Sequence, residues 1–206
     1  MPGRLFLTTP VDDLAAMLGG DASGVVGEPP RRNIAPGQAI VTCRRDRTLA
    51  HMRWGIIPVG RVNARGRPVM ETLINARSET VFSKSAYEGV TRCIVPADGW
   101  YEWTGKARRK TAWRIAARDA RPLWFAAICD AWTAPNGKEL WQVATVTCPP
   151  NGDVRDIHDR MGVLLDIGHI STWLEGDEAD AAALMRPAPD GSLSVEEAVD
   201  VDWTAP

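Results

Sequence analysis

Paired cysteines, tyrosines and long apolar runs are scarce in this 206-residue chain, and each scarcity excludes a class of protein. The four cysteines (Cys43, Cys93, Cys129 and Cys148) are widely spaced with no C-x-x-C pair, which argues against a structural zinc site and a disulfide framework. No apolar run is long enough to cross a membrane, and acidic residues follow the N-terminus too soon for a signal peptide. We therefore expect a cytoplasmic monomer with no membrane segment, no metal and no cofactor.

Familiar catalytic motifs are absent too. The sequence has no glycine-rich phosphate loop, no G-x-S-x-G elbow and no cysteine beside a plausible base. It also has no internal repeat and no clear linker, and its length allows one sizeable core. We therefore treat residues 1–206 as a single domain, and we expect the polar last ~20 residues to be loosely held.

Charge is unevenly distributed behind a net value of −2. Residues 31–110 contain 16 Lys and Arg against 6 Asp and Glu, whereas residues 111–206 contain 7 against 16. A basic block in an otherwise acidic chain indicates an anionic partner that binds one face, with nucleic acid as the leading candidate. The alternative is that part of the block, residues 61–67, is simply an exposed loop.

Strand-like segments dominate the chain. Nine tryptophans against two tyrosines indicate that most indoles fill a core or line a groove. Thr9 and Pro10 predict a helix start, with Thr9 as N-cap, and Gly19 predicts its end. Residues 20–37 are rich in Gly and Pro and are expected to form a loop. We predict strands over 4–8, 38–43, 48–54, 92–96, 111–117, 123–129 and 140–147, and short helices over 81–87, 170–174 and 178–185. Many strands with a few peripheral helices indicate an α+β fold that is β-rich and barrel-like.

The stretch RCIVPADGWYEW, residues 92–103, organises the candidate chemistry. A buried strand is followed by a tight turn and a second run, in which Glu102 points opposite to its neighbours Tyr101 and Trp103. A carboxylate among large aromatics is partly desolvated, which raises its pKa and suits it to proton transfer. The ordinary alternative is a strand whose polar face lies in water.

Asn75 and His158 are the other polar candidates, and each has an ordinary explanation. Asn75 precedes a predicted helix and could be a cap or turn residue. His158 lies between Asp156 and Asp159 and could be a surface histidine paired with a carboxylate. Neither residue has metal-ligand spacing.

Five motifs in order resemble the SOS response-associated peptidase family, the SRAP domain of abasic-site processing proteins. They are NIAPGQ (33–38), RWGIIP (53–58), INARSET (74–80), RCIVPADGWYEW (92–103) and DIHDRM (156–161). The resemblance implies a β-rich fold with a positively charged groove for single-stranded DNA. It also implies catalytic roles for Asn75, Glu102 and His158, and contacts to the site or the DNA backbone from Arg4, Asn33, Arg77 and Thr147.

The N-terminus departs from this family pattern. Members that cross-link to abasic sites begin Met-Cys-Gly-Arg, whereas this chain begins Met1-Pro2-Gly3-Arg4. The family's tryptophan after the proline of the second motif is replaced by Val59-Gly60, Gly162 stands in place of a proline, and a C-terminal Val-Asn segment is missing.

Three readings follow from these departures. In the first, Pro2 is the amine that attacks the aldehyde of an abasic site in single-stranded DNA, assisted by Asn75, Glu102 and His158. In the second, the protein binds single-stranded DNA or a partner without chemistry. In the third, it is a peptidase that acts on its own N-terminus. Without a thiol to close a stable ring, the first reading predicts a transient Schiff base and lyase activity.

Overall fold

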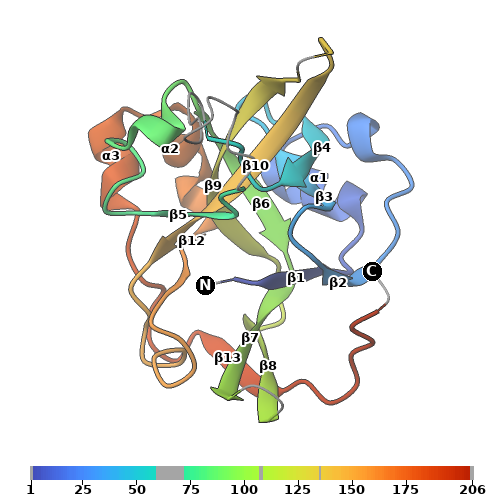
Figure 1. Ribbon diagram of the computed structural model, residues 1–206, viewed down its shortest axis with the longest axis vertical. Coiled ribbons are helices and arrows are strands. Elements are labelled where there is room, and N and C mark those ends of the chain that lie inside the picture. The colour runs from blue at the N-terminus through green and yellow to red at the C-terminus, as the bar shows by residue number, and fades with distance from the viewer. Residues whose placement is uncertain (1, 59–71, 107–108, 135, 205–206) are drawn as a thin grey trace, which may run out of the picture.

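A computed structural model describes residues 2–58, 72–106, 109–134 and 136–204, and its strands form two sheets (Figure 1). One sheet has five strands in the order β13-β8-β7-β1-β2, and the other has eight, in the order β11-β10-β4-β3-β6-β9-β12 with β5 beside β10. The strands are β1 (Arg4–Leu7), β2 (Arg31–Ile34), β3 (Ala39–Cys43), β4 (Leu49–Trp54), β5 (Asn75–Arg77), β6 (Thr91–Ala97), β7 (Gly99–Lys106), β8 (Arg109–Ala117), β9 (Leu123–Thr133), β10 (Glu139–Cys148), β11 (Met161–Gly162), β12 (Leu164–Leu165) and β13 (Leu193–Glu197).

Five strands of the larger sheet close into a barrel. Strand β10 pairs with β4 on one side and with β9 on the other, and β4, β3, β6 and β9 complete the ring. Alternation along these strands turns Ile40, Met52 and Trp54 into the core, where each is at most 2% exposed. The β-rich, barrel-like α+β class predicted from the sequence is therefore confirmed.

The five-stranded sheet is joined to the barrel by the 92–103 stretch. Strand β6 belongs to the barrel and β7 to the smaller sheet, so the chain changes sheet at Asp98. The Asp98 carboxylate accepts hydrogen bonds from the hydroxyls of Thr8 (2.7 Å) and Thr9 (2.6 Å), which fixes the end of β1 to this corner. Trp100 then packs edge-on against Phe125 of the barrel, with ring centroids 5.7 Å apart.

Short helices lie at the periphery of the two sheets (Figure 1). They are α1 (Val11–Leu18), α2 (Ile170–Glu175) and α3 (Glu178–Ala183), with 3₁₀ turns η1 (Ser23–Val25), η2 (Ser85–Tyr87) and η3 (Ile167–His169). The predicted N-cap of α1 is wrong, because Pro10 occupies that position and the Thr9 hydroxyl is bound to Asp98. The predicted end is confirmed: Gly19 adopts the left-handed conformation (φ 61°) that terminates helices.

Three other predictions are corrected by tertiary pairing. Residues 81–87 form turns and the short η2 instead of a helix, and part of the expected 20–37 loop is strand β2, which pairs with β1. The C-terminal end, expected to be loosely held, contributes β13, which pairs with β8 over five residues. In each case a partner elsewhere in the chain decides the local conformation. No helix among the described residues is long and apolar enough to span a bilayer.

Candidate functional site

Pro2 contacts Asn75 at the point where the N-terminal segment runs alongside the strand that carries Glu102. Strand β1 is antiparallel to β7 with Arg4 opposite Tyr101, so the residue before Arg4 faces Glu102 across the ladder. Pro2 is buried two residues before this strand, and its carbonyl oxygen accepts a hydrogen bond from Nδ2 of Asn75 at 3.2 Å. The fold thus brings Pro2 to Asn75 and sets the N-terminal segment alongside Glu102, although these residues are far apart in sequence.

Asn75 is held in one orientation by the barrel. It opens β5, which runs parallel to β10 with Asn75 opposite Thr145. The Thr145 hydroxyl donates to Oδ1 of Asn75 at 2.5 Å, and Nδ2 is directed to Pro2. Because the two ends of the amide have different partners, the orientation of the Asn75 side chain is fixed. An amide does not titrate, so Asn75 can position a reacting group in the same way at any pH. Asn75 is therefore a strand residue, and the cap alternative does not apply.

Glu102 is buried, as the aromatic neighbours in the sequence predict. Glu102 lies on β7, and only 4% of its surface is exposed. Burial is the main cause that raises its pKa to about 7, and the negative charge of Asp159 acts in the same direction. A carboxyl group with this pKa is partly protonated at neutral pH, so it can both donate and accept a proton.

His158 lies next to Asp159, whose charge reaches Glu102. Nδ1 of the imidazole is 3.0 Å from the backbone nitrogen of Arg160 and 2.7 Å from Oδ1 of Asp159. In the neutral ring Nδ1 accepts from the Arg160 N–H and Nε2 carries the proton, whereas in the charged ring Nδ1 donates to Asp159. Burial lowers the pKa of His158, which favours the neutral form at neutral pH.

Arg160 connects this histidine segment to the edge of the barrel. Its guanidinium makes a bidentate pair with Glu79, at 2.5 and 2.8 Å, and lowers the pKa of that carboxyl to about 2. The same guanidinium donates to the backbone oxygen of Thr147 at 2.5 Å. Sequence reasoning missed Arg160 and Thr145, because only the folded chain shows which groups orient the candidate residues.

The four predicted DNA-contact residues fall into two pairs. Arg77 is exposed, and Arg4 is partly exposed with Nη1 bound to Oδ1 of Asn33 at 2.6 Å. Asn33 and Thr147 are buried, and the Thr147 hydroxyl donates to the Ala76 carbonyl at 3.2 Å. In this conformation the two arginines are the groups available to a phosphate backbone, and the two buried residues support the elements that carry them.

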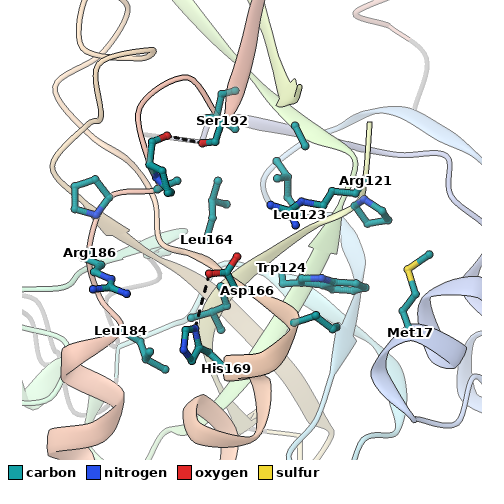
Figure 2. Close-up of a pocket in the computed structure, with 18 residues that line it drawn as sticks. Met17, Arg121, Leu123, Trp124, Leu164, Asp166, His169, Leu184, Arg186 and Ser192 are labelled. Atoms are coloured by element: carbon teal, nitrogen blue, oxygen red, sulfur yellow. Dashed lines mark hydrogen bonds and ion pairs between the residues drawn. The ribbon is translucent and has the colours of Figure 1, made fainter. Parts of the chain in front are cut away.

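A cavity of about 560 Å³ lies apart from these residues (Figure 2). Its walls are mainly apolar and include Leu123, Trp124 and Leu164. Asp166 and His169 also line it, with Oδ2 of Asp166 3.9 Å from Nδ1 of His169. None of the eight predicted site residues lines this cavity. We therefore keep the candidate site at Pro2, Asn75 and Glu102 and do not assign it to this cavity.

All four cysteines are buried as free thiols, and no cluster of three or more metal-ligating side chains is found in the part of the chain that the structure describes. Three features of the sequence lie outside the described residues. They are Met1, the Val59-Gly60 replacement and the basic segment 61–67.

Comparison with known proteins gives a consistent result. The family model described as SOS response associated peptidase (SRAP) matches residues 1–201. The abasic site processing protein YoqW of Bacillus subtilis is 34% identical over 188 residues, which cover 87% of this chain and 83% of YoqW. The abasic site processing protein HMCES of Gallus gallus is 33% identical over 170 residues, covering 69% of this chain and 51% of HMCES.

Solved structures share the fold. A protein from Bacteroides thetaiotaomicron matches with a TM-score of 0.82 and 21% identity, covering 96% of this chain and 92% of that one. A phage-related protein from Bordetella bronchiseptica matches with a TM-score of 0.74 and 28% identity, covering 96% and 94%.

Proposed function

Because this chain belongs to the SOS response associated peptidase (SRAP) family, we propose that it processes abasic sites in single-stranded DNA with Pro2 as the attacking amine. One observation supports this assignment above the others. Glu102, a buried carboxyl with a pKa raised to about 7, lies across the ladder from the N-terminal segment whose Pro2 carbonyl is held by Asn75. This observation supports a role for Glu102 as proton donor and acceptor to a nucleophile in the N-terminal segment.

The proposed reaction begins at the ring-opened abasic sugar, which presents an aldehyde. The secondary amine of Pro2, freed by removal of Met1, forms a bond to the aldehyde carbon, and its N–H proton passes to the oxygen, which becomes a hydroxyl. Protonation by Glu102 lets this hydroxyl leave as water, which gives a cationic iminium. His158, whose pKa is lowered by burial, is the group that accepts the proton lost from the adjacent carbon in the next step.

The iminium has no neighbouring thiol to capture it, because Pro2 replaces the cysteine of the family pattern. Loss of a proton from the adjacent carbon lets the bond to the 3′ oxygen break, and the 3′ phosphate leaves with the bonding electrons. Water then hydrolyses the iminium and releases the amine. The expected outcome is a transient Schiff base with strand cleavage, which is a lyase reaction and not a durable cross-link.

Binding to the strand is assigned to the basic block. Arg77 and Arg4 supply positive charge beside the site, and such contacts give affinity without sequence preference. We expect one protein molecule to bind one single strand in preference to a duplex. A cytoplasmic location follows from the sequence prediction and stays a prediction.

The decisive experiment mixes Met-free protein with single-stranded DNA that contains one abasic site, with and without borohydride. An adduct seen only with the reductant, together with strand cleavage in its absence, is expected. Pro2→Cys should give an adduct that needs no reductant. If Pro2→Cys forms this adduct but wild type gives neither adduct nor cleavage, Pro2 is not a nucleophile and the protein binds without chemistry.

The family's peptidase name suggests a second activity, cleavage of a leader from the protein's own N-terminus by Glu102 and His158. Mass spectrometry of the purified chain and of Glu102→Gln tests it. A leader retained only in the variant would support the peptidase assignment, and identical N-termini would oppose it.

A further inference from the structure

The C-terminal residues 198–204, called here the C-terminal strap, lie across the five-stranded sheet. The Trp203 ring packs against Tyr101 and Trp103, with centroid distances of 5.0 and 5.2 Å. Ala198 and Val201 pack with it on the cluster formed by Phe6, Tyr101 and Ala116. The strap therefore covers the face of the sheet on which Tyr101 and its ladder partner Arg4 lie.

A chain of hydrogen bonds runs from the strap to Arg4. The backbone oxygen of Asp202 accepts from Nδ2 of Asn33 at 3.3 Å, and Oδ1 of Asn33 accepts from Nη1 of Arg4 at 2.6 Å. Asn33 is 3% exposed, so an unmet donor or acceptor there would be costly. A flipped amide would point two donors at the guanidinium and an acceptor at the Asp202 carbonyl. The strap carbonyl is thus one partner that favours the Asn33 orientation in which Oδ1 accepts from Arg4.

The charge of the strap is directed away from this contact. The Asp202 carboxylate accepts from the backbone nitrogen and the hydroxyl of Thr204, at 2.8 and 2.6 Å, while the neutral backbone oxygen faces Asn33. The Asp202 group that supports Asn33 is therefore a neutral carbonyl and not a carboxylate.

We infer that the C-terminal strap positions Arg4, through Asn33, for the backbone of the bound DNA strand. This inference rests on the proposed function, since it assigns a supporting segment to the same site. Trp203 is the anchor of the strap, and Asp202 supplies the carbonyl. Both are positioning residues, because they affect the bound DNA only through Arg4.

The test is a double-mutant cycle measured by fluorescence anisotropy with an abasic-free single-stranded oligonucleotide at several salt concentrations. Arg4→Ala should weaken binding several-fold and reduce the salt slope by about 0.7, the value for one phosphate contact on a single strand. Trp203→Ala should reproduce part of both effects in the wild-type background. It should have no further effect in the Arg4→Ala background, because its action requires that arginine.

Two control variants separate positioning from general stability. Trp203→Phe keeps an aromatic anchor and should restore binding, and Trp132→Ala, a tryptophan on β9 outside the strap cluster, should leave the salt slope unchanged. Equal effects of Trp203→Ala with and without Arg4 would mean that the strap acts on stability alone. Tighter binding by Trp203→Ala would overturn the inference in favour of a strap that blocks the strand.

The outcomes also distinguish this inference from the proposed function. Wild-type protein that does not bind single-stranded DNA at low salt would contradict the proposed function itself. Wild-type binding that weakens with Arg4→Ala but is unaffected by Trp203→Ala would contradict only the role of the strap.

Discussion

The closed barrel and the open five-stranded sheet differ in how each is held together. The five barrel strands pair with each other around a complete ring, and most of their buried side chains are apolar. The smaller sheet ends at β2 and β13, and one of its faces is covered by the C-terminal strap. The smaller sheet also carries Glu102, Arg4 and Asn33, which are three of the predicted site residues.

The candidate site draws on both regions. Asn75 is attached to the barrel through β5 and Thr145, whereas Glu102 and the N-terminal segment belong to the smaller sheet. A ring of paired strands has no free edge at which to shift, so it provides a fixed reference for the groups opposite. The two regions share one hydrophobic core, which includes Leu5 and Trp100 of the smaller sheet. We expect the chemistry to depend on how the smaller sheet is placed against the barrel.

The largest expected difference is in the cost of removing one indole from each region. Trp54 is fully buried in the barrel and donates to the Ile74 carbonyl at 3.0 Å, so Trp54→Ala should lower the free energy of unfolding by about 3–5 kcal/mol. Trp203 is partly exposed on the strap, so Trp203→Ala should cost only about 1–2 kcal/mol. Urea denaturation of both variants measures this contrast, and equal losses would remove it.

The pH dependence of stability should reveal the buried carboxyl of the smaller sheet. Glu102 titrates near 7 when folded and near 4.5 when unfolded, so between these values the folded state holds the extra proton. Stability from this group is fully present below about pH 4.5 and is lost as the pH rises to 7, by up to about 3 kcal/mol. Urea denaturation at several pH values between 4.5 and 7 should show a free energy of unfolding that falls as the pH rises. The Glu102→Gln variant should lack this dependence on pH. A slope unchanged in Glu102→Gln would mean that the carboxyl is not desolvated.

The contribution of each region to catalysis can be measured on the abasic-site reaction. Glu102→Gln, in the smaller sheet, and His158→Ala, in the segment that follows β10, should each lower the single-turnover rate by more than about tenfold and by roughly 10²-fold for a full acid–base role. Circular dichroism should show that both variants fold. Wild-type rates in both variants would show that neither Glu102 nor His158 takes part in the reaction.

The smallest expected effect concerns the ion pair at the edge of the barrel. Glu79 is half exposed and pairs with Arg160, so solvent screening leaves Glu79→Gln within about 0.5 kcal/mol of wild type. A thermal melt at low and high salt is the measurement, with Glu88→Gln, a neighbouring acid in the same segment, as control. A decrease of several kcal/mol in the free energy of unfolding would show that the Glu79–Arg160 pair is needed to hold Arg160 against Thr147.

The strand pattern was predictable because apolar, β-branched and aromatic runs are local properties of the chain. The 38–43 and 48–54 segments indeed pair as β3 and β4, and the 92–96 run is the core of β6. The helix start at Thr9 was not predictable, because its hydroxyl is bound by Asp98, which lies 89 residues away. Likewise, nothing local indicates that residues 81–87 remain in turns.

The sequence by itself determined the family, the β-rich class and the identity of the candidate groups, because ordered motifs and residue types survive without coordinates. It also indicated that Glu102 would be desolvated, since large aromatics flank it on the strand. Only the tertiary structure decided that Asn75 binds the Pro2 carbonyl, that Arg160 supports Thr147 and that the C-terminal strap reaches Asn33. These contacts join residues separated by up to 169 positions, and a hydrogen bond depends on distance and direction that no local pattern specifies.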